Sequence, residues 1–137
     1  MTTALEIRLI QVAGIIHAGI VVANLPLPRK LKVAENLANV PRFLRQVFYV
    51  HWIYIVLVVG FFSVLCFGYP RELMGASPLG RFLSGFMAGF WFLRLVLQLF
   101  YYDPELRRQI RILDGTYNVV LVALVAIFGF AAMHPVA

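Results

Sequence analysis

Charged residues are scarce in this sequence: 13% of its 137 residues are Asp, Glu, Lys or Arg, whereas 62% are apolar. A soluble domain carries roughly half apolar and about a quarter charged residues, so the composition excludes an ordinary soluble domain. The charge is also unbalanced, because Lys and Arg total 12 and Asp and Glu total 6. In an apolar chain such an excess is first interpreted as the charge that orients it in a membrane. We therefore expect an integral membrane protein whose partner is the lipid bilayer. We do not expect it to bind nucleic acid.

Cysteine pairs and the motifs of common enzymes are missing as well. Cys66 is the only cysteine, which excludes an intrachain disulfide framework, and no Cys and His residues have the spacing of a zinc site. The chain has no nucleophile elbow, phosphate-binding loop or HExxH motif. Asp114 is the only acid inside the predicted spans, so no paired carboxylates are available there. These absences favour a protein that is not an enzyme.

Long apolar runs are what the sequence has in abundance. A helix needs about 20 mainly apolar residues to cross a bilayer, and four segments qualify, each followed closely by a proline, which cannot continue a helix. We expect spans at about 7–24, 47–68, 81–102 and 112–133, forming an all-α, up-down four-helix bundle in one domain, 1–137. The first run is interpreted as a span rather than a cleaved signal peptide, because Arg8 is offset by Glu6 and the basic n-region is weak.

Basic residues predict how the spans are oriented. The connection 25–46 carries five of the twelve Lys and Arg residues, and the connection 103–111 carries three. The positive-inside rule places both connections in the cytoplasm and both termini outside, in a bacterial-type inner (plasma) membrane. Anionic lipids are the expected neighbours of these connections. Apolar residues at helical spacing in 32–46 predict an amphipathic helix, which either lies on the inner leaflet or packs beneath the bundle.

Small residues predict where helices approach one another closely. Gly85 and Gly89 form a GxxxG motif in the third span, and such a motif allows two helix backbones to come into contact. The motif serves either packing inside the bundle or association with a second copy or another membrane subunit. The sequence leaves both possibilities open.

One arginine lies inside the third span and requires polar partners. Arg94 is nine residues, or about 13 Å along a helix, from Asp103, and a charge at that depth is costly unless it faces acceptors within the bundle. Asp114, Tyr117 and Asn118 recur at i, i+3 and i+4 on the fourth span and form one polar face. We expect Asp114 to be the counter-ion of Arg94, with Gln98 extending the network by one turn.

Two histidines are expected at the same level from the first two spans. His17 lies about 10 Å from the cytoplasmic end of the first span, His51 lies about 9 Å beyond Arg45 at the cytoplasmic start of the second, and Tyr54 shares a face with His51. Together these positions predict a polar layer in the cytoplasmic third of the bundle. Its members, and the predicted cofactor-binding residues, are His17, His51, Tyr54, Arg94, Gln98, Asp114, Tyr117 and Asn118.

Three functions are compatible with such a layer. Two neutral imidazoles on neighbouring helices are suited to ligate a b-type haem, with Arg94 next to a propionate. The same side chains are suited to bind the head group of a quinone or lipid. A hydrogen-bonded network that selects one helix arrangement needs no ligand at all. We expect the last, in a non-catalytic packing or scaffolding subunit of a larger membrane assembly or in a self-associating oligomer; the alternative is a small haem b electron-transfer or quinone- or lipid-binding protein.

Overall fold

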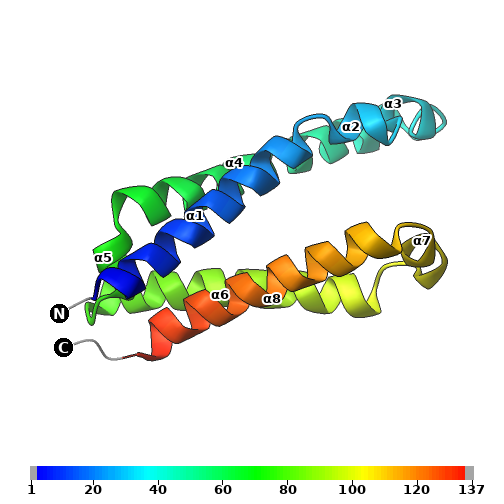
Figure 1. The fold of residues 1–137 in the computed structure, drawn as a ribbon. Coiled ribbons are helices and arrows are strands. Elements are labelled where there is room, and N and C mark those ends of the chain that lie inside the picture. Colours follow the sequence, from blue (N-terminus) through cyan, green and yellow to red (C-terminus); the bar gives the residue numbers. More distant parts are fainter. Residues whose placement is uncertain (1–2, 135–137) are drawn as a thin grey trace.

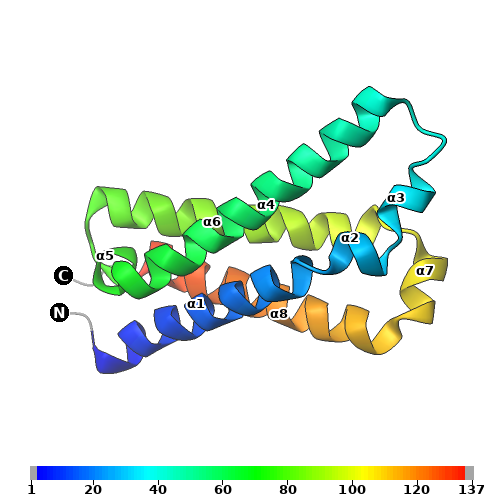
Figure 2. The same ribbon diagram turned by 90° about the horizontal axis from the view of Figure 1, so that it is seen from above.

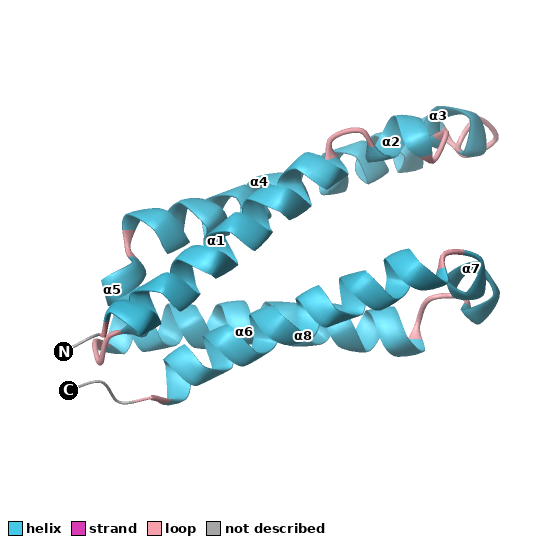
Figure 3. Ribbon diagram, in the orientation of Figure 1, coloured by secondary structure: helices cyan, strands magenta, loops and turns pink. Residues whose placement is uncertain are grey.

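The regular elements of this protein are helices, as a computed structural model that describes residues 3–134 shows (Figure 3). Four of them are long and apolar enough to cross a membrane: α1 (Ala4–Asn24), α4 (Arg42–Gly68), α6 (Pro78–Phe100) and α8 (Arg111–Met133). Four short helices lie in the connections: α2 (Leu27–Lys30), α3 (Val33–Asn36), α5 (Pro70–Met74) and α7 (Pro104–Gln109). The predicted all-helical fold with four helices of spanning length is confirmed.

The ends of the helices follow local sequence signals. The side chains of Thr3 and Glu6 form a capping box at the start of α1, in which each accepts a backbone N–H of the other. Ser77 caps α6 by accepting a hydrogen bond from the backbone N–H of Gly80. Pro70, Pro78 and Pro104 are the first residues of α5, α6 and α7, where a missing N–H costs no intrahelical hydrogen bond.

The continuous helix expected over 32–46 is wrong. The chain divides this segment between α3, which ends at Asn36, and α4, which begins at Arg42. Pro41 explains the break, because a proline disfavours helical conformation in the residue before it, and Pro41 itself has an extended ψ of 139°. As a consequence, α4 starts at Arg42 instead of residue 47 and carries its basic first turn as part of a 27-residue helix.

The four long helices form two hairpins. Helices α1 and α4 pack along each other as the first hairpin, and α6 and α8 pack along each other as the second. The short α5 contacts all four long helices and links the hairpins. Figure 1 shows that the hairpins lie close together at the end that holds α5 and both termini, and that they diverge toward the end that holds α2, α3 and α7. In the view from above, α4 crosses α6 obliquely and diverges from it toward the end that holds α3, and α1 partly overlaps α8, which it contacts (Figure 2).

The apolar core lies in the half of the molecule near α5. Helix α1 contacts α4 closely there: the Ser63 hydroxyl donates a hydrogen bond to the Gly14 carbonyl at 2.9 Å, and a Cβ added to Gly14 would lie 2.9 Å from the Cβ of Cys66. Gly85 packs inside the second hairpin, where an added Cβ would lie 3.8 Å from Ala132. The buried apolar residues are Ile10, Ala13, Val33, Val59, Phe62, Cys66, Leu73, Met74, Met87, Trp91, Leu121, Leu124, Phe128 and Ala131.

Candidate functional site

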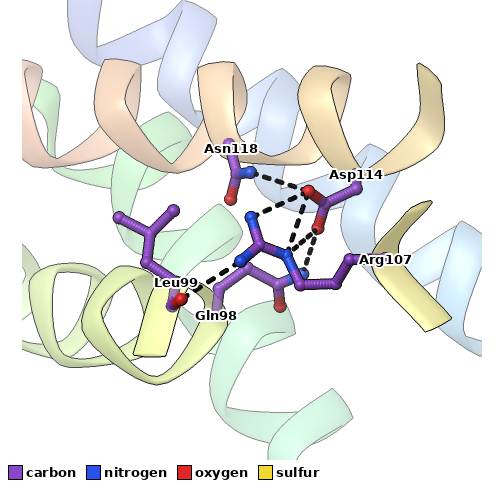
Figure 4. Close-up of polar contacts among 5 residues, drawn as sticks. All are labelled: Gln98, Leu99, Arg107, Asp114 and Asn118. Carbon is purple, nitrogen blue, oxygen red and sulfur yellow. Dashed lines mark hydrogen bonds and ion pairs between the residues drawn. The ribbon is translucent and has the colours of Figure 1, made fainter. Parts of the chain in front are cut away.

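A polar cluster lies where α6, α7 and α8 meet, and Asp114 is its centre (Figure 4). Arg107 from α7 donates to the carboxylate through Nη2, 3.0 Å from Oδ2, and through Nε, 3.2 Å from both oxygens. Gln98 from α6 donates to Oδ1 at 2.7 Å, and Asn118 donates to Oδ2 at 3.2 Å. The second Nη of Arg107 donates to the Leu99 carbonyl at 3.1 Å. This cluster therefore holds the two helices of the second hairpin and α7 together.

The counter-ion of Asp114 is Arg107, and the expected pair with Arg94 is not formed. The reason is the turn after α6: the helix ends at Phe100, and α7 folds back so that Arg107 reaches the first turn of α8. An arginine at the end of the bundle loses less hydration on pairing than one deeper in the helix. The structure does bring Gln98 and Asn118 to Asp114, as the sequence predicts.

Arg94 is surrounded by aromatic rings instead of acids. Its guanidinium carbon lies 5.1 Å from the ring centroid of Tyr102 and 5.5 Å from that of Tyr117. Such cation–π contacts contribute about 0.5–2 kcal/mol, with the larger values in dry surroundings. Among residues 3–134, Arg94 forms no ion pair, and none of their oxygen atoms accepts a hydrogen bond from it. The N–H donors of Arg94 therefore have no acceptor among the described residues.

His17 is fully buried and joins the two hairpins. Its Nδ1 lies 2.6 Å from the Ala13 carbonyl, and its Nε2 lies 3.0 Å from the indole nitrogen of Trp91 on α6. A carbonyl can only accept and an indole N–H can only donate, so Nδ1 carries the proton and Nε2 is the acceptor. The rings of Phe62 and Phe128 lie 5.7 Å from the imidazole and enclose it. Both ring nitrogens are thus used within the protein.

The structure does not bring His51 to His17. His51 is exposed, and its Nδ1 lies 2.9 Å from the Val47 carbonyl of its own helix. His17 contacts Phe62, and the eleven residues from 51 to 62 correspond to about 16 Å along α4. The expectation of equal depth is wrong because the register between α1 and α4 was unknown. Tyr54 is exposed on the same half of α4 as His51, so the predicted layer is divided into separate parts.

Two further polar contacts were not found from the sequence. His134, directly after α8, is partly buried: it stacks on Phe130, and its Nε2 lies 3.4 Å from Oε1 of Glu6 on α1. Helical periodicity could not pair Arg107 with Asp114, because the two residues lie on different helices. The only sequence signal nearby was Asp103-Pro104, which indicates a turn. Within the described residues, no group of three or more His, Cys, Asp and Glu side chains is placed to hold a metal ion.

No family model matches this chain, and no curated protein or solved structure matches it either. A functional proposal therefore depends on the contacts described above. These are a saturated carboxylate at Asp114, a buried histidine whose ring nitrogens are both occupied, and an arginine in a spanning helix that contacts two tyrosines.

Proposed function

We propose that the protein is a non-catalytic subunit of a membrane assembly whose simplest form is an oligomer of this chain. The polar groups inside the spanning helices support a structural role, because Asp114 accepts from three side chains and His17 uses both ring nitrogens. Exceptions among the described residues include Oδ1 of Asn118, which is shielded from solvent and accepts no hydrogen bond, and the guanidinium of Arg94, which donates none. Arg94 carries the proposal, because its donors are free to bind an acceptor on another molecule.

The depth of Arg94 along α6 explains why its charge requires hydrogen-bond acceptors. It lies six residues before the end of α6 at Phe100, which is about 9 Å along the helix. A charged side chain near the middle of a bilayer costs about 2.5–3.5 kcal/mol on the lenient insertion scale, and less toward the interface. The contacts with Tyr102 and Tyr117 offset part of this cost. These rings do not supply oxygen acceptors for the five N–H donors of the guanidinium, and no oxygen of residues 3–134 accepts a hydrogen bond from it.

The surface beside Arg94 is suited to a second helix. Gly89, Leu93 and Leu97 recur every four residues on α6, and all three are exposed. A Cβ added to Gly89 would meet no atom within 4 Å among the described residues, so another backbone can approach there as it does in small-xxx-small interfaces. We propose that this Gly89–Leu93–Leu97 surface contacts a second copy, which supplies a carbonyl or carboxylate oxygen to Arg94.

The proposed orientation follows the basic residues. The connections that contain α2, α3 and α7 lie at the same end of the molecule, opposite both termini (Figure 1). Together with the adjoining first turns of α4 and α8, they carry eight of the twelve Lys and Arg residues. We propose that this end faces the cytoplasm of a bacterial-type inner membrane, with the four long helices crossing in up-down order and α2 and α3 at the inner leaflet.

The oligomeric state of the purified protein tests the proposal. Native mass spectrometry in mild detergent should give an oligomer of the full chain, and Arg94→Gln should weaken assembly by about tenfold or more, because the partner's acceptor is then left unpaired. Arg108→Gln is the matched control, because Arg108 is exposed and has only a weak contact with Glu105. Circular dichroism of each variant would verify that the helices are retained.

Two results would contradict the proposal. One is a wild-type protein that stays monomeric at every ratio of protein to lipid. The other is an Arg94→Gln variant that assembles as the wild type does. A monomer that carries a bound quinone released by Arg94→Gln would instead assign this arginine to the quinone-binding alternative.

A further inference from the structure

The segment between α1 and α4 folds into a pocket that the proposed function does not use. Pro26 and Pro28 lie at the turn after α1 and at the start of the short α2, and Lys32 turns the chain with a left-handed φ of 49° between α2 and α3, which pack against each other. The result is a pocket of about 820 Å³, within the range of roughly 300–1,000 Å³ that ligand sites occupy. Its polar and aromatic lining consists of Arg29, Lys32, Glu35, Tyr49 and Trp52.

The lining combines positive charge with aromatic rings. Arg29 and Lys32 contribute two cations, and Glu35 contributes one carboxylate, which leaves one net positive charge. Nζ of Lys32 lies 3.8 Å from Oε2 of Glu35, but the two side chains are 70% and 73% exposed. This ion pair is therefore weak and leaves the lysine ammonium able to bind an anion. The pocket is therefore suited to an anion with a single negative charge.

Trp52 provides an independent sign of a ligand. Its indole N–H is shielded from solvent, and within the described part of the chain no atom accepts a hydrogen bond from it. A shielded donor without an acceptor destabilises the fold, and native structures rarely keep one without a reason. Trp52 lies one turn from Tyr49 on α4, so both aromatic side chains border the same pocket. An oxygen-bearing ligand in the pocket would give the indole its acceptor.

The position of the pocket points to a lipid. It lies between the end of α1 and the beginning of α4, two helices of spanning length. Leu31, which precedes the lining residue Lys32, and Phe43, in the first turn of α4, are 55% and 71% exposed, as expected for a segment that lies on a membrane surface. Tryptophan and tyrosine are enriched at that level of the bilayer. A soluble phosphate has no apolar part that could contact these side chains, whereas a lipid has one.

We propose that the pocket binds the head group of an anionic phospholipid such as phosphatidylglycerol. Arg29 and Lys32 bind the phosphate, and the Trp52 N–H donates to a phosphate or ester oxygen. The single charge of the phosphodiester matches the net charge of the pocket. This site lies on the first hairpin, does not involve Arg94, and does not depend on self-association.

Native mass spectrometry of the full chain, with acyl-matched phospholipids added in detergent, tests the site. We expect one phosphatidylglycerol per chain to be retained in preference to phosphatidylcholine and phosphatidylethanolamine. Arg29→Gln and Lys32→Gln should each weaken this binding about fivefold, the effect of one basic residue at a membrane surface. Trp52→Phe, which keeps the ring and removes the N–H, should weaken it as well.

Lys30→Gln is the matched control. Lys30 lies in sequence between Arg29 and Lys32, is exposed and does not line the pocket. Its replacement therefore lowers the net charge of the segment without changing the residues that line the pocket. Equal losses in Lys30→Gln and Arg29→Gln would reduce the effect to general surface charge and overturn the proposal. Equal retention of phosphatidylcholine, or displacement of the lipid by glycerol 3-phosphate at similar concentration, would overturn it too.

Discussion

The indole N–H of Trp91 donates a hydrogen bond of 3.0 Å to Nε2 of His17, and both side chains are buried. The bond runs between α1 and α6 and so connects the two hairpins inside the core. The Ala13 carbonyl requires a proton on Nδ1, so Nε2 can only accept a hydrogen bond. If the Trp91 N–H were removed, no change of tautomer would satisfy both ring nitrogens. The pair is thus a polar contact with one permitted arrangement, which selects how the hairpins meet.

Trp91→Phe should destabilise the protein by about 1–3 kcal/mol, because Nε2 of His17 then lacks a donor in the core. The measurement is the unfolding free energy in mixed micelles, followed by circular dichroism. Trp52→Phe is the control, since it removes an indole N–H without an acceptor among the described residues, outside the core. Equal destabilisation by the two substitutions would show that ring size, and not the hydrogen bond to His17, determines the effect.

The same geometry predicts the optical properties of the protein. Haem ligation by His17 requires the Nε2 lone pair that accepts from Trp91, and His51 lies about 16 Å along α4 from Phe62, the residue of that helix that contacts His17. Protein purified from cells that load a control cytochrome should therefore show no Soret band, before or after reduction with dithionite. A Soret band that is lost in both His17→Ala and His51→Ala would restore the haem hypothesis and contradict the structural role of His17.

Much of the fold could be predicted because it depends on local signals. Length and hydropathy located four helices, and the prolines at 26, 70 and 104 marked three of their ends. The helix expected over 32–46 failed at Pro41, because an apolar spacing of three and four residues outweighed a local breaker in that interpretation. Helical periodicity also brought Asp114 and Asn118 to one face correctly.

The candidate site could be predicted only in part, because partners across helices depend on register and turns. The depth of His51 was counted from Arg45, three residues after the actual start of α4 at Arg42, and no periodic pattern encodes the register between α1 and α4. Asp114 met Arg107 because α7 folds back, although Arg94 was the more conspicuous arginine in the sequence. Tertiary geometry decided between two arginines of equal charge.

A double-mutant cycle should separate those two arginines. Arg107→Gln and Asp114→Asn should show a clear coupling energy, since Arg107 donates to both carboxylate oxygens. Arg94→Gln and Asp114→Asn should be nearly additive, because Arg94 contacts Tyr102 and Tyr117 instead. Unfolding free energies in mixed micelles supply both cycles. Stronger coupling of Asp114 to Arg94 than to Arg107 would return the counter-ion to the arginine that the sequence first suggested.

Gly14 and Gly19 provide a matched pair on α1. A Cβ on Gly14 would lie 2.9 Å from the Cβ of Cys66 and 3.1 Å from the ring of Phe67, whereas a Cβ on Gly19 would meet no atom within 4 Å in the described structure. Gly14→Ala should therefore cost about 1–3 kcal/mol through overpacking and loss of the Ser63 hydrogen bond geometry. Gly19→Ala should be neutral or slightly stabilising, because alanine favours the helix. The pair is compared by thermal unfolding in detergent.

The proposed orientation predicts where reporter enzymes will be active. Alkaline phosphatase folds only outside the cytoplasm, since its disulfides require an oxidising compartment. A fusion after residue 137 should therefore be active, whereas fusions after residues 38 and 109, beside α3 and α7, should be inactive. Replacing Arg107, Arg108 and Arg111 with Gln should weaken this preference, because the basic residues set the orientation, and a triple Gln variant with Arg8, Arg71 and Arg81 replaced should strengthen it. Activity at residue 38 together with inactivity at residue 137 would reverse the orientation and move the basic pocket around Arg29 to the outer surface of the membrane.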